Sequence, residues 1–326
     1  MKIHHKYLVL VSLALIFSLL TLNNKMNVNA QEPQGKNWMS FIGDQRPLQF
    51  ISIPGTHDSG ALHNLSIKDI FTNKDIVLTY AQTQNKTIVE QLEMGVRYLD
   101  IRCRFNNGKF EIYHGSVSQK QSFDDVIKAC QKFLKENPSE TIIMNIKEEN
   151  SKTTNNTFSQ RFVQYYYSYP NLFEIGNHIP KLGEVRGKIV VIRRFVSGDN
   201  IGIDAQSFWK DNTTFIAENK NGVQFYIQDN YKFSKNELKF DNFKKALEES
   251  GKEIKMNRGS RKLHLNFTSG QLDGASGSKI KAVSDYINPK LVSLFSQTQY
   301  QNSFNGIIIT DFVNEDIARV IYETNF

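Results

Sequence analysis

Two histidines of the sequence lie where acid–base chemistry can be carried out. His57 and His114 each come directly after a short apolar, strand-like run and lie beside glycine. Imidazole titrates near neutral pH, so two such side chains can supply one proton acceptor and one proton donor to a reaction. A single histidine of this kind is more often structural, but four charged side chains occupy the same kind of position here: Asp58, Asp100, Arg102 and Asp311. The pair therefore indicates a catalytic site.

An aspartate and an arginine alternate in the segment 98–102. In a strand, Asp100 and Arg102 project to one side, and Leu99 and Ile101 to the other. By the same spacing Asp229 and Tyr231 share a face. The Asp–Arg pair is either a structural ion pair or a rigid receptor for a phosphodiester, because a guanidinium held by a carboxylate binds phosphate oxygens well. The residues by themselves leave both interpretations open.

The remaining histidines of the chain beyond residue 30 are not assigned to this site. His63 and His178 lie in expected loops or helix surfaces and receive no role. His264 alternates with Leu263 and Leu265 in a strand-like run. We expect it to face the interior of a barrel, in a packing or hydrogen-bonding role.

The candidate residues follow a recurring pattern, in which a short apolar run ends in polar residues and a helical segment often comes next. Such runs are typical of buried strands bounded by turns. They cover residues 50–53, 96–101, 110–113, 141–146, 188–192, 223–228, 263–267 and 306–309. Helices are predicted over residues 123–135, 158–167, 236–249, 278–286 and 315–322. Ser122 and Asp125 have the spacing of a capping box at the start of the first helix.

This alternation predicts a single α/β domain, a distorted TIM (β/α) barrel. Strands that alternate with helices form a mainly parallel sheet, and eight runs in a domain of this size favour closure into a barrel. In such barrels the active site lies at the carboxyl ends of the strands, which is where the polar residues fall in this sequence. The alternative is a three-layer α/β sandwich, which no glycine-rich nucleotide loop supports.

The first thirty residues have the layout of a secretory signal peptide. Lys2 and Lys6 precede an apolar run over 8–20, and 28–30 suits a signal-peptidase site. We therefore expect residues 1–30 to be removed and 31–326 to be one catalytic domain outside the cell. The alternative, an uncleaved membrane anchor, is disfavoured because the apolar run is short.

Charge and cysteine content exclude several classes of protein. The net charge is +7, and removal of the three lysines of the first thirty residues leaves +4. Such a mild positive charge suits anionic lipid surfaces and is far from the basic stripe of a nucleic-acid-binding protein, so no nucleic-acid partner is expected. Cys103 and Cys130 are the two cysteines of the chain, which excludes a disulfide-framed scaffold. They are either one disulfide or two packed thiols.

The motifs resemble a known family. The segments ISIPGTHDSG at 51–60, DIR at 100–102 and YHG at 113–115 look like the X-box region of bacterial phosphatidylinositol-specific phospholipase C, a metal-independent family. The resemblance continues in the same order through residues 137–147, 187–194, 228–231, 287–289 and 310–312. It implies a distorted TIM barrel, in agreement with the pattern of runs.

The resemblance implies roles for the catalytic candidates. His57 would be the general base that takes the proton of the inositol 2-hydroxyl, with Asp311 fixing its tautomer. His114, supported by Asp58, would be the general acid that protonates the departing diacylglycerol oxygen. Arg102 would neutralise the phosphate oxygens. Asp100 would orient this cluster.

The resemblance also implies an inositol pocket and no cofactor. Lys147, Arg194 and Asp229 would bind the ring hydroxyls and Tyr231 would stack on the ring. Calcium-dependent relatives hold a metal with carboxylates where this chain has Arg102, so we expect neither a metal nor another cofactor. The resulting hypothesis is a secreted, monomeric phosphorus–oxygen lyase that releases diacylglycerol and inositol 1,2-cyclic phosphate from phosphatidylinositol, with glycosyl-phosphatidylinositol anchors of proteins as further candidate substrates.

Membrane contact is assigned to a segment just after the first catalytic histidine. Ile67, Ile70 and Phe71 have helical spacing, and in the family a short helix here touches the bilayer together with a rim loop. The spacing alone fits a core-facing helix equally well. The other rim segment, 269–278, lacks the tryptophan of well-known relatives, so we expect lysines and anionic lipid to contribute more to peripheral membrane binding.

Two other functions compete with the lyase. The first is a metal-dependent glycerophosphodiester phosphodiesterase, which would need a Glu–Asp–His metal cluster in place of Asp100 and Arg102. The second is a secreted lipid-binding module without catalysis, against which the complete set of histidines, carboxylates and arginine argues.

Overall fold

The computed structural model describes residues 32–68, 75–151, 153–154, 156–255, 262–273 and 280–326. The predicted signal peptide at 1–30 lies outside them. Strands of the described chain are β1 (Ile53–Thr56), β2 (Leu65–Lys68), β3 (Asp75–Leu78), β4 (Tyr98–Asn106), β5 (Lys109–His114), β6 (Val117–Ser122), β7 (Ile142–Glu148), β8 (Phe173–Glu174), β9 (Ile189–Arg194), β10 (Ile203–Asp204), β11 (Thr214–Glu218), β12 (Gln224–Gln228), β13 (Lys232–Phe233), β14 (Lys262–Phe267), β15 (Gln271–Leu272) and β16 (Ile307–Thr310).

The five predicted helices are present in the described chain, although the one predicted over 278–286 continues to Phe295, and two short helices, Ile88–Glu93 and Leu182–Val185, were not predicted. The α-helices are α2 (Ile88–Glu93), α3 (Phe123–Glu136), α4 (Thr157–Ser168), α5 (Leu182–Val185), α6 (Asn236–Lys255), α7 (Ile280–Phe295) and α8 (Glu315–Glu323). The short 3-10 helices are η1 (Trp38–Phe41), η2 (Leu48–Phe50) and η3 (Thr298–Tyr300). The capping box before α3 is confirmed, since Ser122 and Asp125 each bond the other's backbone N–H.

A 12-stranded mixed sheet organises the described chain. Nine of its strands lie in the order β10-β9-β7-β4-β1-β16-β14-β12-β11, and β5, β6 and β8 pair beside this path. From β10 to β12 every neighbouring pair is parallel, and β11 is antiparallel to β12. Among the described residues no pairing joins β10 to β11, so the closed barrel is not seen. The fold is therefore of the mixed α/β class with a parallel central sheet, as the alternation of runs and helices predicts.

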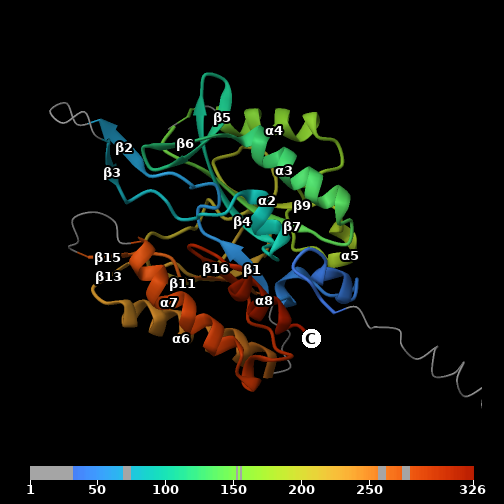
Figure 1. Ribbon diagram of the computed structural model, residues 1–326. Helices are drawn as coiled ribbons and strands as arrows, with labels where there is room; N and C mark the ends of the chain where they lie inside the picture. Colours follow the sequence, from blue (N-terminus) through green and yellow to red (C-terminus); the bar gives the residue numbers. More distant parts are fainter. Residues whose placement is uncertain (1–31, 69–74, 152, 155, 256–261, 274–279) are drawn as a thin grey trace, which may run out of the picture. The chain divides into compact units, whose positions relative to one another are not determined.

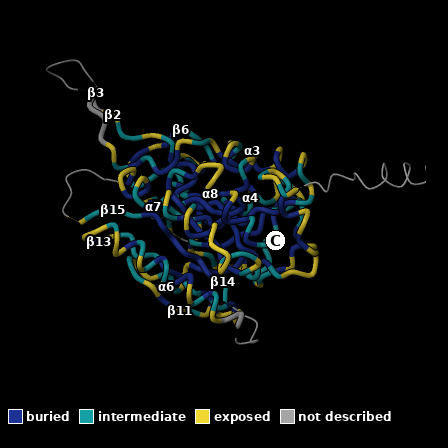
Figure 2. Tube along the Cα trace, turned by 60° about the horizontal axis from the view of Figure 1, so that its bottom comes forward, coloured by how far each residue is buried: buried dark blue, intermediate teal, exposed yellow. Residues whose placement is uncertain are grey.

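The two faces of the sheet bury different clusters, because successive side chains of a strand alternate. In β4, Leu99 and Ile101 belong to a core that includes buried residues of α3, α7 and α8, whereas Tyr98 belongs to a second core. Figure 1 shows α6 and α7 lying side by side and α3 beside the hairpin β5–β6. The strands of the central sheet are mostly buried, whereas α6 alternates between exposed and buried residues (Figure 2).

The second core collects residues from strands at both ends of the sheet order. It contains Ile192 of β9 and Ile203 of β10 together with Phe225 of β12 and Phe215 of β11. Its base, at the amino ends of the strands, includes Trp38 of η1. Since this base is filled by packed side chains, the polar ends of the same strands are free to form a site at the opposite end.

A buried ion pair ties the amino-terminal segment to that base. Arg97 and Glu140 are both fully buried, and Nη2 and Nε of the arginine lie 2.8 Å and 3.0 Å from Oε2 of the glutamate. The same carboxylate accepts a hydrogen bond from the backbone N–H of Met39. Burial alone would lower the pKa of Arg97, and the neighbouring carboxylate acts against this effect. The pair is thus a structural element far from the polar ends of the strands.

The run 110–113 is not one of the parallel strands, which corrects the expectation of eight equivalent strands. β4 is nine residues long, and β5 returns antiparallel to it. Asn107 and Gly108 form the turn, with φ angles of 47° and 75°. These angles are those of a two-residue hairpin turn, which Asn-Gly favours. His114 is therefore brought to the site by a hairpin and not by the end of a parallel strand.

Three smaller expectations also need correction. The first run, 50–53, is a 3-10 turn at its start, and the strand begins at Ile53. His264 does not share the side of Leu263 and Leu265, which belong to the second core; it is buried and stacks on Tyr226, with ring centroids 5.2 Å apart. Its packing role is confirmed, but its predicted direction is wrong, because the side chains of adjacent residues in a strand point to opposite faces.

The expected helix after His57 is a strand where the structure describes it. Residues 65–68 form β2, which pairs antiparallel with β3. Leu65 and Ile67 alternate with Ser66 and Lys68, a period of two that favours a strand over a helix. Ile67 lies in β2, while Ile70 and Phe71 lie outside the described residues.

The two cysteines are free thiols. Cys103 of β4 and Cys130 of α3 are both fully buried in the first core. Burial raises the pKa of Cys130 to about 12, so this thiol stays protonated at neutral pH. Of the two alternatives from the sequence, packed thiols are the correct one.

Candidate active site

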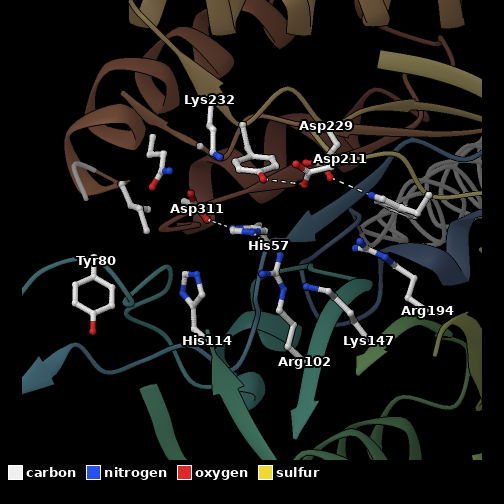
Figure 3. Close-up of a pocket in the computed structure, with 15 residues that line it drawn as sticks. His57, Tyr80, Arg102, His114, Lys147, Arg194, Asp211, Asp229, Lys232 and Asp311 are labelled. Carbon is white, nitrogen blue, oxygen red and sulfur yellow. Dashed lines mark hydrogen bonds and ion pairs between the residues drawn. The ribbon is translucent and has the colours of Figure 1, made fainter. Parts of the chain in front are cut away.

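A cavity of about 400 Å³ opens at the carboxyl ends of the parallel strands. Eight of the ten predicted catalytic and inositol-binding residues line it: His57, Arg102, His114, Lys147, Arg194, Asp229, Tyr231 and Asp311. Figure 3 shows the two histidines near one another and the three cations pointing into the cavity from one side. The other two, Asp58 and Asp100, are fully buried beneath it. The structure thus brings together all ten residues.

Three cations form a row across three neighbouring strands. Arg102 of β4 is in register with Lys147 of β7, and Lys147 is in register with Arg194 of β9. Residues in register on parallel strands point to the same face, so the three side chains lie next to one another. The strand ends therefore build a cationic wall that suits an anionic substrate group at Arg102.

His57 and Asp311 form a hydrogen-bonded pair above two neighbouring strands. Thr56 of β1 is in register with Thr310 of β16, so the residue after each strand lies beside the other. His57 Nδ1 is 2.8 Å from Oδ1 of Asp311. Burial by itself would lower the pKa of His57, but the negative charge and the hydrogen bond of Asp311 outweigh it and raise the pKa. The imidazole is thereby prepared to accept a proton on its other nitrogen.

The Arg102 guanidinium lies at the centre of the site. Its Nη2 is 2.8 Å from Nε2 of His57 and 3.2 Å from Oδ2 of Asp100, and its Nη1 is 3.6 Å from Oδ2 of Asp58. Burial opposes the charge of Arg102, but the two carboxylates raise its pKa well above the ordinary value. The site therefore contains a permanent, fixed cation next to the proton acceptor.

Asp100 is a buried carboxylate that anchors this cation. Asn145 Nδ2 donates to its Oδ1 at 2.9 Å, and the backbone N–H of Asp58 donates to its Oδ2 at 3.1 Å. Although burial acts in the other direction, the charges of Arg102, His57 and Arg194, together with the bond from the Asp58 N–H, hold the pKa of Asp100 far below its usual range. Its role in the structure is to fix Arg102, because it does not line the cavity.

His114 lies on the other side of the cavity mouth from Asp311. The ring centroids of His57 and His114 are 6.3 Å apart and the ring planes are at 86°. His114 Nδ1 donates to the backbone oxygen of Ala81 at 2.7 Å, while Oδ2 of Asp58 is 3.5 Å away. A backbone carbonyl, and not the expected Asp58 carboxylate, is therefore the hydrogen-bond partner of this histidine.

Asp58 combines a left-handed backbone with a buried carboxylate that makes no hydrogen bond within the described chain. Its backbone is left-handed, with φ of 43°, and neither carboxylate oxygen has a hydrogen-bond partner among the described residues. Burial raises its pKa, against the opposing effects of Arg102 and His114. Because it lies between these two side chains, Asp58 responds electrostatically to the protonation of His114.

The second half of the cavity is built from an aromatic ring between two charged groups. The guanidinium carbon of Arg194 lies 3.5 Å from the ring centroid of Trp209, and Nε1 of Trp209 donates to Oδ2 of Asp229 at 3.2 Å. The hydroxyl of Tyr231 donates to Oδ1 of Asp211 at 2.8 Å. These contacts pre-position a cation, a carboxylate and an aromatic ring, the groups that bind a polyhydroxylated ring.

Lys147 is paired with a carboxylate that the sequence reasoning did not assign. Its Nζ is 2.7 Å from Oε2 of Glu149, and Oε1 of Glu149 accepts from the backbone N–H of Gly115. Burial, followed by the nearby Arg102, lowers the pKa of Lys147. Glu149 therefore connects the cationic row to the residue that follows His114.

Sequence reasoning missed several cavity residues. These are Tyr80, Trp209, Asp211, Lys232, Gly270, Gln271 and Ile280, whereas Glu149 pairs with Lys147 without lining the cavity itself. Asp211 and Trp209 lie between strands and carry no local pattern. Lys232 was detectable, since it follows the assigned Tyr231 directly.

Comparisons with known proteins identify the family. Residues 52–195 match the family described as phosphatidylinositol-specific phospholipase C, X domain. Over 311 residues the chain is 30% identical to the 1-phosphatidylinositol phosphodiesterase of Staphylococcus aureus (strain Newman), which covers 89% of this chain and 94% of that protein. The chain belongs to the bacterial phosphatidylinositol-specific phospholipase C family. The 1-phosphatidylinositol phosphodiesterase of Listeria monocytogenes is 31% identical, with 89% of this chain and 85% of that protein covered.

Solved phospholipase C structures have the same fold. A mutant form of the Staphylococcus aureus phosphatidylinositol-specific phospholipase C superposes with a TM-score of 0.75 at 29% identity, covering 90% of this chain and 98% of the other. The Listeria monocytogenes phosphatidylinositol-specific phospholipase C gives a TM-score of 0.63 at 27% identity, covering 90% and 99%. The match to the X domain contains both histidines and the cationic row, whereas Asp229, Tyr231 and Asp311 lie beyond it.

Two further observations concern metal-binding groups and membrane-spanning helices. Within the described ranges, no three histidine, cysteine, aspartate or glutamate side chains gather as a metal-binding group, so the Glu–Asp–His cluster of the competing phosphodiesterase is not found there. In the same part of the chain, no helix is both long and apolar enough to cross a bilayer. Neither competing function is supported by the family assignment.

Proposed function

We propose that this phospholipase C family member cleaves phosphatidylinositol by acid–base catalysis between His57 and His114. The observation that carries the proposal is the position of the Arg102 guanidinium: it contacts His57 and lies at the mouth that His114 shares. Ring centroids 6.3 Å apart leave room for a phosphodiester between the two imidazoles. The chemistry of the substrate explains why these groups are needed.

The reaction is an intramolecular displacement at phosphorus. In phosphatidylinositol the inositol 2-hydroxyl is cis to the 1-phosphate, so it attacks phosphorus without needing an ordered water. His57 Nε2 takes the 2-hydroxyl proton as the new P–O bond forms. The P–O bond to glycerol breaks, and His114 gives its proton to the diacylglycerol oxygen. The products are diacylglycerol and inositol 1,2-cyclic phosphate, and each proton transfer contributes on the order of 10²–10⁴ in rate.

The charge that develops on the non-bridging oxygens is met by Arg102. Asp100 holds this guanidinium in place, and Asp311 stabilises the imidazolium that forms on His57. A fixed cation in a buried site needs no reorganisation during the reaction, which is the source of its catalytic effect. Since Arg102 supplies this charge, the proposed reaction requires neither a metal ion nor another cofactor.

The inositol ring is proposed to occupy the half of the cavity around Trp209. Arg194 and Asp229 bind ring hydroxyls, Lys147 supports them, and Tyr231 stacks on the ring. Asp229 would repel a ring phosphate, so unphosphorylated headgroups are preferred. A second cavity of about 410 Å³ shares Trp209, Lys147 and Arg194 with the first. It offers space for the sugar of a glycosyl-phosphatidylinositol anchor.

The remaining features of the proposal concern the fold and the setting of the enzyme. A distorted barrel is supported by the second core, which joins residues from both ends of the sheet order.

The described chain acts as a monomer outside the cell, after removal of residues 1–30. Peripheral membrane contact is supported by the Staphylococcus aureus structure described as concerning modulation of membrane binding. Ile67, Ile70 and Phe71 are proposed to contribute to this contact.

³¹P NMR of phosphatidylinositol vesicles, incubated with the enzyme and excess EDTA, tests the proposal. The expected result is a growing cyclic-phosphate signal and a matching loss of the phospholipid signal. Loss of activity in EDTA would overturn metal independence, and appearance of inositol 1-phosphate without a cyclic intermediate would overturn the intramolecular mechanism. The double variant His57→Ala/His114→Ala is the control for contaminating phospholipase.

A further inference from the structure

A fully buried glutamine in the segment before α2 joins the two strand ends that bear the proton acceptor and its carboxylate. Gln84 Nε2 donates to the backbone oxygen of His57 at 3.0 Å and to that of Thr310 at 2.9 Å. Its Oε1 accepts from the backbone N–H of Val313 at 3.2 Å. Both N–H donors and the oxygen acceptor of this side chain are therefore bonded to backbone groups. These groups belong to His57 itself and to residues on either side of Asp311.

The neighbouring residue reinforces the same connection. The backbone oxygen of Thr83 accepts from the N–H of Phe312 at 2.7 Å, and its hydroxyl donates to the backbone oxygen of Asp58 at 2.9 Å. Phe312 has a left-handed backbone, with φ of 50°. A non-glycine residue in this region is costly and persists only where its surroundings hold it. The turn that carries Asp311 is therefore held from outside by residues 83 and 84.

We propose that Gln84 is a positioning residue for the His57–Asp311 pair: its amide holds the ends of β1 and β16 at the separation at which the imidazole and the carboxylate are hydrogen-bonded. Beyond the paired residues of β1 and β16, the N–H of His57 donates to the backbone oxygen of Thr310 at 3.0 Å. Among the described residues, this is the one backbone hydrogen bond that joins His57 or Asp311 to the end of the other strand. Gln84 adds a second, side-chain connection on the same carbonyl of Thr310.

The effect on catalysis follows from the geometry of the pair. The Nδ1–Oδ1 distance of 2.8 Å is within hydrogen-bonding range, and the bond is lost if the two turns move apart by about 1 Å. A misplacement of that size can reduce the rate about 100-fold. Gln84 does not itself line the cavity, and its bond to His57 is made to the backbone oxygen, so its loss should leave substrate binding almost unchanged.

The chain offers a matched control in Gln119 of β6. This glutamine is also buried, and its Nε2 donates to the backbone oxygens of His63 and Val117 while its Oε1 accepts from the N–H of His63. It therefore makes the same kinds of bond as Gln84, but to residues outside the cavity lining. Gln84→Met and Gln119→Met each remove these bonds while keeping a side chain of similar length.

The kinetic test compares these variants on phosphatidylinositol in mixed micelles. Gln84→Met should lower kcat by about 10- to 100-fold with KM within about threefold of the original, whereas Gln119→Met should keep kcat within about threefold. In an Asp311→Ala background, adding Gln84→Met should cost less than about threefold, because the contact it protects is already absent. Equal losses in both backgrounds, or a normal kcat in Gln84→Met, would overturn the proposal.

A second readout is independent of turnover, which matters because the proposal rests on the proposed function. The pKa of His57 is followed by NMR of its imidazole, assigned by its absence in His57→Ala. The charged groups that face this ring are Asp311 beyond β16, Arg102 and Asp100 on β4, and Asp58 beyond β1. Asp311 raises the pKa of His57, so loosening the pair in Gln84→Met should lower that pKa by about half a pH unit or more.

The outcomes separate the two proposals. An unchanged His57 titration in Gln84→Met, with Gln119→Met equally unchanged, would reject the positioning role whatever the activity. A shifted titration in a protein that releases no cyclic phosphate from phosphatidylinositol would support the positioning role and reject the proposed function. If Gln84→Met does not fold, Gln84→Asn, which keeps the amide and withdraws it by one methylene, is measured in the same way and judged by the same criteria.

Discussion

Arg102 donates a hydrogen bond to Nε2 of His57 at 2.8 Å. A guanidinium has no acceptor, so Nε2 must be the unprotonated nitrogen, and the proton of the neutral ring lies on Nδ1, directed at Asp311. This is the tautomer that a general base needs. When a phosphodiester binds, its oxygens can accept the guanidinium hydrogen bond in place of Nε2 of His57. Nε2 is then available to accept the proton of the 2-hydroxyl.

The first prediction concerns the two imidazoles. His57→Ala and His114→Ala should each lower kcat on phosphatidylinositol by about 10²–10⁴-fold, because each removes one proton transfer. KM should change much less, since neither ring is proposed to bind the inositol hydroxyls. The control is His178→Ala, a residue that does not line the cavity, which should keep its full rate. Near-normal kcat in either of the first two variants would refute the assigned roles.

The second prediction concerns the cation. Arg102→Lys keeps a positive charge but loses the planar fork that reaches His57, Asp100 and Asp58 together, and its kcat should fall by about 10²–10³-fold. Arg102→Ala should lose more and regain part of its activity in tens of millimolar guanidinium. The measurement is the initial rate with and without guanidinium, and a Lys variant within threefold of the original rate would contradict the proposed phosphate contact.

The third prediction is a pH dependence. His57 must be neutral to accept a proton, so kcat/KM falls as the pH drops through the pKa of His57. Burial and Arg102 lower this pKa, but Asp311 raises it above the ordinary value of 6.5 overall. The acidic limb of the profile should therefore lie above pH 6.5.

Removing the charge of Asp311 should shift this pH dependence. Asp311→Asn removes the negative charge that favours the imidazolium, so the acidic limb should move to lower pH while the maximum rate falls. The measurement is kcat/KM against pH for both proteins, with a water-soluble phosphatidylinositol analogue as substrate. A limb that stays in place in Asp311→Asn would show that another group controls it.

Strand alternation was sufficient to predict that Asp100 and Arg102 share a face. Their placement follows from a period of two, and Leu99 and Ile101 define the opposite face. The ends of the parallel strands then place Lys147 and Arg194 beside Arg102, because register between neighbouring strands is fixed by the shared core. Local pattern thus determines which side chains reach the cavity floor.

The position of His114 shows where this reasoning is insufficient. Equal spacing of apolar runs suggested one more parallel strand, whereas Asn107–Gly108 turns the chain back into a hairpin. That dipeptide is a hairpin signal and was available in the sequence. The hydrogen bond from His114 to Ala81 was not available, since it depends on a loop brought in from elsewhere.

The fourth prediction concerns the ring that separates Arg194 from Asp229. Trp209→Phe keeps an aromatic face for Arg194 but removes the N–H donated to Asp229, and Trp209→Ala removes both. A hydrogen bond to a charged group and a cation–π contact are each worth about 1–2 kcal/mol. KM should therefore rise by about fivefold to thirtyfold in Trp209→Phe, which loses the hydrogen bond, and by more in Trp209→Ala, which loses both contacts. By contrast, kcat should be nearly unchanged in both variants. An unaltered KM in Trp209→Ala would exclude this ring from the headgroup site.

The last prediction uses a buried lysine behind the inositol pocket. Lys239 of α6 is fully buried and donates to Oε1 of Gln228 at 3.0 Å and to the backbone oxygen of Asn230 at 2.8 Å. Within the described part of the chain, the hydrogen-bond partners of its ammonium are these two neutral oxygens. Burial lowers the pKa of Lys239 to about 7, although the more distant Asp229 and Asp311 act to raise it.

This pKa makes the stability depend on pH. The unfolded chain keeps an ordinary lysine pKa near 10.5, so between about pH 7 and pH 10 it binds more protons at this position than the folded protein does. The free energy of unfolding should then rise with pH by up to about 1.4 kcal/mol per pH unit from this residue alone. Below about pH 7 the ammonium is charged in both states, so the full penalty is present and its dependence on pH disappears.

The comparison with Lys239→Met isolates the effect. Urea unfolding of both proteins at pH 5.0, 6.0, 7.5 and 8.5 should give a difference in unfolding free energy that is nearly constant between pH 5.0 and 6.0. Between pH 7.5 and 8.5 the original protein should gain about 1 kcal/mol relative to the variant, because the methionine does not titrate. Parallel curves across that interval would mean that the ammonium keeps its proton in the folded protein, and that polar partners such as Gln228 and Asn230 compensate fully for its burial.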